Sequence, residues 1–240
     1  MFAALRSYFR PSGDPAGPAS RRRWDRTLRL FAFEFVVVVA GVLAAQGLQS
    51  WAAERSQRSS GELLLTGARQ NVQSFGSSLA FWTSSGPCLR AHVRRIAAVA
   101  SSGGTLTQRE IGRPALPAVP VTSWTEEGRE RALRVVSAIE FARYIGVNAT
   151  AQNVNEAEQE IGREWAALRL IDPALGAPLA EDRSRVRQAA AAIDSRIGYI
   201  LYTREQTGRL AAQLGIEMPR SASPRVTALI DRCGLIKDWR

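Results

Sequence analysis

The apolar run at residues 30–50, LFAFEFVVVVAGVLAAQGLQS, constrains the fold of this chain more than any other feature of its sequence. At about 1.5 Å of rise per residue, a helix of this length measures roughly 31 Å, which matches the hydrocarbon core of a bilayer at about 30 Å. The run therefore predicts a single transmembrane helix, to which we assign residues 28–51.

The basic residues that flank this run predict its orientation. The residues that follow it mix Glu54 with Arg55 and Arg58, whereas five arginines precede it: Arg21, Arg22, Arg23, Arg26 and Arg29. Positive residues close to a span stay on the cytoplasmic side. We therefore expect residues 1–27 to form a basic cytoplasmic leader, largely disordered because it is rich in proline and glycine, and residues 52–240 to lie on the opposite side of the membrane.

A cleaved signal peptide is the main alternative to a retained span. The basic region, the apolar run and the small residues Ser50 and Ala52 fit the outline of a signal peptide. Signal cores usually contain about 7 to 15 apolar residues, however, and this run is longer and has a long leader. The lengths favour a retained transmembrane helix; cleavage would instead give a secreted helical protein.

One side of the predicted span combines small and polar residues. Glu34, Gly41, Ala45 and Gln49 fall on one stripe when successive residues turn by about 100°. Small residues let two helix backbones approach, and polar side chains can hydrogen-bond between membrane helices. The stripe therefore predicts a contact face for a second copy or another membrane protein. The alternative, which stays open here, is the ordinary composition of a membrane helix with Glu34 at the interface.

The two cysteines predict a disulfide. Cys88 and Cys233 are the only cysteines, and both lie on the predicted outer side of the membrane, where disulfides persist. Loop-closure entropy puts the contribution of such a bridge at about 4 to 5 kcal/mol. Two free buried thiols are the alternative. Two cysteines and the single histidine, His92, do not make a metal-ligand set, so no metal site is expected.

The rest of the chain shows helical periodicity and no run of alternating strand residues. Apolar stripes predict a helix that continues from the span and ends at residues 84–87, a second from Cys88 to residue 101, and a loop with three prolines at 105–122. A capping box at Ser123 and Glu126 opens the next helical region, and helices at 179–214 and from Pro224 complete the chain. We therefore expect an all-α protein with an N-terminal transmembrane helix followed by an extracytoplasmic antiparallel helical bundle.

The charged residues form no pattern typical of a catalytic or nucleic-acid-binding site. The formal net charge is +10, yet Lys237 is the only lysine, so we attribute the arginines to GC-rich coding and expect no nucleic-acid partner. His92 is expected to be a packed or surface residue. Two acidic clusters and one basic cluster are expected to be solvated helix faces: Glu126, Glu127 and Glu130; Glu156, Glu158 and Glu160; Arg183, Arg185 and Arg187. For the basic cluster, the alternative is a contact with lipid or with an acidic partner. We expect no catalytic residue and no cofactor.

Several of these features together resemble a known group of proteins. The sequence from Glu34 to Trp51, the helical region with Cys88 and Leu89, and the glycine- and proline-rich loop that leads into Ser123 resemble uncharacterised single-pass inner-membrane proteins of GC-rich alphaproteobacteria. The resemblance implies the bacterial inner membrane and a periplasmic C-terminal domain, and implies no activity, cofactor or catalytic residue.

The expected function is therefore that of a non-enzymatic, membrane-anchored interaction protein. It would be an accessory or scaffold subunit of an inner-membrane assembly, or a protein that associates with itself through the transmembrane helix. The alternative is a periplasmic sensor or small-ligand-binding module. That function requires a pocket between helices, lined by aromatic residues such as Trp82, Trp124, Tyr144 or Trp165.

Overall fold

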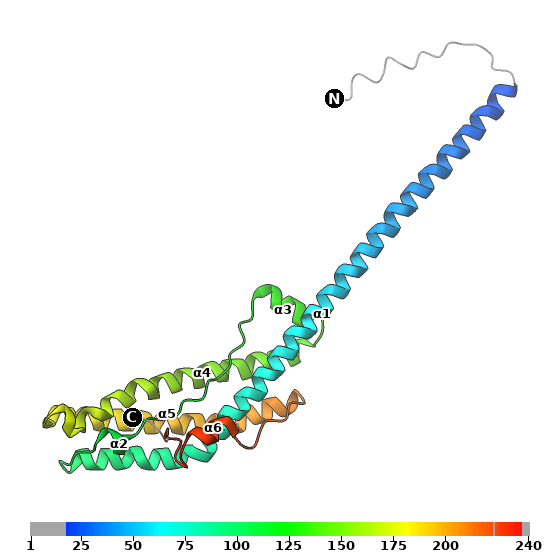
Figure 1. Cartoon of the computed structure of the whole chain (residues 1–240). Helices are drawn as coiled ribbons and strands as arrows, with labels where there is room; N and C mark the ends of the chain where they lie inside the picture. The colour runs from blue at the N-terminus through cyan, green and yellow to red at the C-terminus, as the bar shows by residue number, and fades with distance from the viewer. Residues whose placement is uncertain (1–17, 223, 237–240) are drawn as a thin grey trace, which may run out of the picture. The chain divides into compact units, whose positions relative to one another are not determined.

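The computed structural model describes residues 18–222 and 224–236, and all regular elements in these ranges are helices. The α-helices are α1 (Pro18–Ser101), α2 (Gln108–Ile111), α3 (Glu126–Leu133), α4 (Ala138–Leu168), α5 (Ala180–Gln213) and α6 (Pro224–Leu229) (Figure 1). Two 3-10 helices, η1 (Arg169–Ile171) and η2 (Pro173–Leu175), link α4 to α5. The prediction of an all-α chain with one long apolar helix near the N-terminus is confirmed.

The chain divides into two units, Met1–Ser56 and Gln57–Arg240. We call the second unit the folded region. The first 17 residues of the predicted leader lie outside the described residues, whereas residues 18–27 are helical.

Helix α1 passes through Pro87, although the sequence predicts that a helix ends there. Proline cannot donate a backbone hydrogen bond within a helix, and such a site commonly bends it. The hydroxyls of Ser84 and Ser85 donate to the Phe81 carbonyl, and Figure 1 shows α1 changing direction within the folded region. The core contacts on both sides of Pro87 keep the two halves helical; they include the buried residues Leu79, Trp82, Leu89 and Val93.

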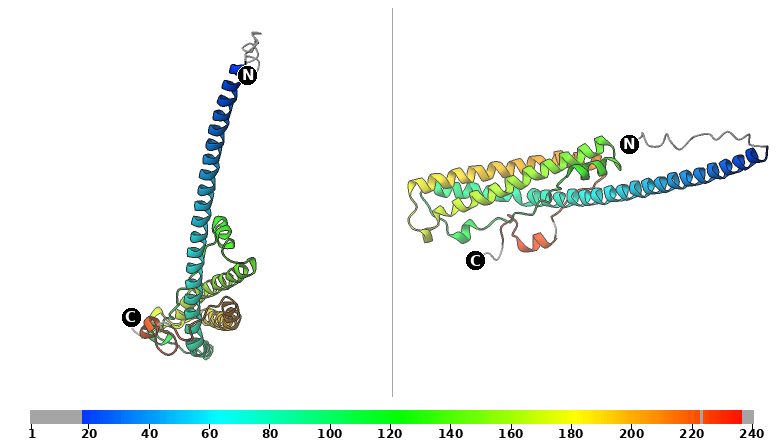
Figure 2. Two further views of the ribbon diagram at one scale, coloured as in Figure 1. Left: turned by 90° about the vertical axis from the view of Figure 1, so that its right-hand side faces the viewer. Right: turned by 90° about the horizontal axis from the view of Figure 1, so that it is seen from above.

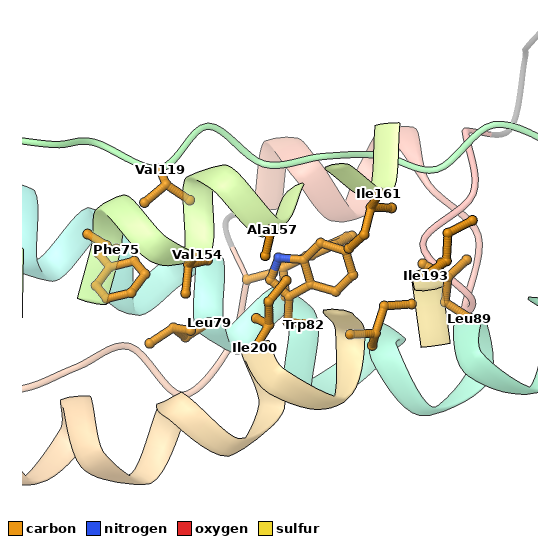
Figure 3. Close-up of a cluster of buried hydrophobic side chains, with 14 of the residues drawn as sticks. Phe75, Leu79, Trp82, Leu89, Val119, Val154, Ala157, Ile161, Ile193 and Ile200 are labelled. Atoms are coloured by element: carbon orange, nitrogen blue, oxygen red, sulfur yellow. The ribbon is translucent and has the colours of Figure 1, made fainter. Parts of the chain in front are cut away.

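The long helices of the folded region share one hydrophobic core. Helices α4 and α5 run antiparallel: Glu160 pairs with Arg196 at 2.5 Å, and Arg143 near the start of α4 donates to the Gln213 carbonyl at the end of α5. The C-terminal part of α1 lies beside both helices, as the two views in Figure 2 show. Figure 3 shows side chains from α1, α4 and α5 meeting around Trp82. The apolar stripes that predict these helices are mostly buried; their buried residues include Ala68, Val72, Phe75, Ile96, Val154, Ile161, Leu168, Val186, Ile193 and Ile197.

The loop and the helix starts differ from the sequence prediction. The proline-containing loop includes the short helix α2, whose capping box uses Thr107 and Glu110. The cap of α3 is Thr125, whose hydroxyl accepts from the Gly128 amide, so the predicted cap at Ser123 is wrong by two residues. A turn at residues 134–137 separates α3 from α4. Three apolar residues on either side of this break are exposed and do not join the core: Leu133, Ile139 and Ile145.

Candidate functional site

The N-terminal part of α1 is an apolar helix without a protein core around it. An 18-residue window in this part has a mean hydropathy of 2.0, and none of its residues is buried. Its large apolar side chains are exposed on every side of the helix: Leu30, Phe31, Phe33, Phe35, Val36, Val37, Val38, Val39, Val42, Leu43, Leu48 and Trp51. A helix that is apolar all round fits a protein interior or a membrane. This helix is long and apolar enough to span a bilayer.

The residues of the predicted contact face are all exposed. Glu34, Gly41, Ala45 and Gln49 lie in this part of α1, and no described atom beyond the local helix comes within 4 Å of the position that a Gly41 Cβ would occupy. The face is therefore open to the close approach of a second helix. The predicted arginine flank, residues 21–29, belongs to the segment whose side chains are not described.

The residues that follow the apolar segment suit a membrane interface. The guanidinium of Arg55 lies 5.5 Å from the centre of the Trp51 ring, within the range of a cation–π contact. Tryptophan and arginine both place an apolar body beside a polar group, which is the arrangement enriched where hydrocarbon meets water.

Cys88 and Cys233 form a disulfide, as the sequence predicts. Their Cα atoms are 4.9 Å apart, and the bridge joins α1 to a C-terminal turn. Asp231 builds that turn by accepting from the amides of Cys233 and Leu235 at 2.8 and 2.9 Å. Gly234 packs against α1 with a positive φ of 76°, and a Cβ at this position would lie 3.0 Å from Phe81 and Ser85. The bridge and the turn together fix the C-terminal segment to α1.

Glu158 is a buried carboxyl group, not the solvated residue that the sequence predicts. Its side chain lies between α4 and α1 and is only 4% exposed. Its Oε1 atom accepts from the Trp82 indole at 2.6 Å and from the Ser78 hydroxyl at 3.5 Å. Burial raises the pKa of Glu158 to about 7, although both hydrogen bonds act in the opposite direction. The group can therefore change protonation state near neutral pH.

The position of Glu158 was readable from the sequence, because it follows Val154 by four residues and precedes Ile161 by three. Both neighbours are buried, so Glu158 lies on the inward stripe of α4. Its neighbour Glu160 pairs with Arg196 on α5. The prediction of a solvated face treated Glu158 and Glu160 alike because it relied on the acidic composition of this stretch and not on its spacing.

The basic cluster at the start of α5 is also more than a solvated face. Arg183 donates to the Gly104 carbonyl at 2.8 Å, and Arg185 pairs with Glu164 of α4 at 2.8 Å. Both contacts tie α5 to neighbouring segments. The sequence could not indicate them because their partners are distant in the chain.

The candidate aromatic pocket is not one cavity. Trp82 is fully buried, and Trp124 and Tyr144 line a cavity of about 10 Å³, which has room for no more than about one water molecule. Trp165 instead lies beside His92, with its indole donating to the Gly112 carbonyl at 3.1 Å. His92 Nε2 lies 3.0 Å from the Ile111 carbonyl oxygen, so His92 is a packed residue next to α2.

Trp165 also lines an open groove of about 780 Å³, which we call the α4 groove. The groove is lined by the extended segment 112–118, by Gly162, Trp165 and Ala166 of α4, and by Arg169 at the start of η1. Ile230 and Ile236 also contribute to the lining. Its lining is largely apolar, and its charged residues are Arg113 and Arg169.

Among the residues whose side chains the structure describes, no group of three or more histidine, cysteine or acidic side chains could hold a metal ion. Compared with known proteins, the chain matches no family model, no curated protein and no solved structure.

Proposed function

We propose that this chain is a non-enzymatic, single-pass protein of the bacterial inner membrane that acts by associating with other membrane helices. Residues 28–51 span the bilayer, the N-terminus is cytoplasmic, and the folded region is a periplasmic helical bundle. The observation that carries the proposal is the exposure of apolar side chains around the whole circumference of α1 in this segment. Water solvates such a surface poorly, whereas lipid chains and neighbouring membrane helices cover it favourably.

The distribution of charge and the disulfide support the proposed orientation. More arginines precede the span than directly follow it, as expected when the N-terminus is cytoplasmic. The Cys88–Cys233 bridge suits an oxidising compartment such as the periplasm. Alkaline phosphatase fused after residue 240 tests this orientation, because the enzyme is active only when it is exported. An inactive fusion in an intact, membrane-bound protein contradicts the proposed orientation.

The contact face of the span supports association with a second copy or with a larger assembly. Gly41 and Ala45 leave space for a neighbouring backbone, and Glu34 and Gln49 can hydrogen-bond across the contact. The proposed role is that of an accessory or scaffold subunit, or of a self-associating protein.

Two differently tagged copies, expressed together and extracted in a mild detergent, test the contact face. We expect wild-type chains, or a chain and a defined membrane partner, to co-purify, and we expect Gly41→Leu and Glu34→Leu to abolish the association. Ala40→Leu is the matched control, because it introduces the same side chain, leucine, about 100° away from Gly41 on the helix. Retention of neither a second copy nor a partner by wild type, or equal loss with Ala40→Leu, contradicts the proposal.

A further inference from the structure

The α4 groove has the shape and charge of a ligand site that the proposed association function does not use. Its volume of about 780 Å³ lies within the range of about 300 to 1,000 Å³ that is usual for small-molecule sites. It is open because two lining positions of α4 carry little or no side chain, Gly162 and Ala166, one helical turn apart. A Cβ on Gly162 would lie 3.2 Å from the Leu116 side chain, so this glycine lets the extended segment approach α4.

The lining of the groove has two kinds of surface, one apolar and one positively charged. Pro114, Leu116, Pro117, Ile230 and Ile236 contribute apolar side chains, and none of the described residues that line the groove is acidic. Arg113 and Arg169 are its charged groups. Neither forms an ion pair with a carboxylate in the described part of the chain. The groove therefore complements a ligand with an apolar body and a negative group.

Arg169 supplies a hydrogen-bond donor suited to such a group. Its Nη2 atom donates to Gln108 Oε1 at 2.5 Å, which fixes the guanidinium beside the groove. Its Nε atom is buried and has no hydrogen-bond partner among the described residues. A carboxylate oxygen is a strong acceptor for a guanidinium.

From this combination we propose that the α4 groove binds a single-chain alkyl carboxylate, of the fatty-acid class, with its chain along residues 114–118 and its carboxylate at Arg169 and Arg113. A carboxylate is favoured over a bulkier head group because the positive charge of the groove is limited to two guanidiniums. The site lies entirely within the folded region, so the proposal does not depend on the contact face of the span.

Calorimetric titration of the full-length protein in phosphatidylcholine nanodiscs with decanoate tests this inference, after subtraction of the heat from empty discs. We expect saturable binding of decanoate by wild type and no binding of acetate, which lacks the alkyl chain. Decyltrimethylammonium, with a similar chain and the opposite charge, is expected not to bind. Tighter binding of decyl phosphate than of decanoate would overturn the assignment of a carboxylate.

Four variants assign the binding to the groove. We expect Ala166→Leu, which fills the groove from an exposed helix position, to abolish decanoate binding, and Arg169→Gln and Arg113→Gln each to weaken it about tenfold. Arg163→Gln is the matched control, because Arg163 is an exposed arginine of α4 outside the groove. Arg113 is exposed, so its variant remains informative if Ala166→Leu perturbs folding. Undiminished binding by Arg113→Gln and Arg169→Gln, or an equal loss with Arg163→Gln, would overturn the proposal.

Discussion

The two parts of helix α1 have similar backbones and opposite surface patterns. In the N-terminal part, large apolar side chains are exposed on every side; in the part within the folded region, they form one stripe that is buried, from Ala68 through Phe75 to Trp82. A striped helix buries its apolar side chains against other protein helices, whereas an unstriped one requires an apolar environment on all sides. The angular distribution of side chains, and not helix propensity, therefore distinguishes the two parts of α1.

Charge inside the unstriped part provides the strongest test of this comparison. Val39→Arg with Leu43→Arg places two arginines in the proposed span and away from Gly41, and each costs about 2.5 to 3.5 kcal/mol of insertion free energy. We expect the double variant to leave the membrane pellet after carbonate extraction.

The control for this variant places the same charges on the folded region. Leu63 and Ile139 are 71% and 68% exposed there, so Leu63→Arg with Ile139→Arg should leave the protein in the pellet. Full membrane retention of the Val39 and Leu43 double variant would show that residues 28–51 are not a span.

Removal of the disulfide tests what stabilises the striped part. Cys88→Ser with Cys233→Ser should lower the free energy of unfolding by about 4 to 5 kcal/mol, because the unfolded chain regains the entropy of a long loop. The readout is the urea midpoint of the full-length protein in detergent. Each single variant should cost about as much as the double variant, since either one breaks the bridge. A double variant as stable as wild type would show that the packing of the C-terminal turn is sufficient.

Glu158 makes the stability of the striped part depend on pH. Its pKa rises from 4.5 to about 7 on folding, so its favourable contribution is complete below pH 4.5 and is lost as the pH rises toward about 7. This difference corresponds to about 3 kcal/mol of unfolding free energy between about pH 4 and pH 8. We expect Glu158→Gln, which keeps an acceptor for the Trp82 indole, to remove this dependence.

Urea midpoints of wild type and Glu158→Gln at several pH values measure the effect. The urea midpoint of the variant should exceed that of wild type by an amount that increases up to about pH 7 and then stays constant. A difference that does not change with pH would show that Glu158 keeps one protonation state over this range.

Asp194 is expected to have a smaller effect of opposite sign. Hydrogen bonds from Arg90, and then from Arg94, lower the pKa of Asp194 from 3.8 to about 2. Its stabilising contribution is therefore present above pH 3.8 and lost as the pH falls through about 2, and we put it at about 1 to 2 kcal/mol after screening by solvent. Asp194→Asn should reduce stability at pH 6 and have little effect near pH 2. Equal destabilisation at both pH values would indicate lost packing instead.

The sequence predicts features that depend on local periodicity and misses those that depend on distant partners. The apolar run, the buried stripes of α4 and α5 and the pairing of the two cysteines follow from spacing, hydropathy and compartment. The passage of α1 through Pro87 does not, because the core contacts that keep it helical come from α4, α5 and the C-terminal turn.

The same distinction applies to the candidate site. The residues of the contact face could be predicted from the rotation of about 100° per residue in a helix. The α4 groove could not be predicted, because its lining combines residues 112–118, α4 and Ile236, which are far apart in the sequence. Glu158 is an intermediate case: its spacing from Val154 placed it inward, but two neighbouring acidic residues suggested a polar surface.

The disulfide also has a mechanical consequence. A force applied between the N-terminal end of α1 and the C-terminus passes along α1 to Cys88 and then across the bridge to Cys233, a separation of 145 residues in sequence. The intervening helices are bypassed and cannot be pulled into an extended chain while the bridge is intact. A protease that cuts once within residues 105–122 would likewise leave a single covalent molecule, whose two pieces separate only after reduction.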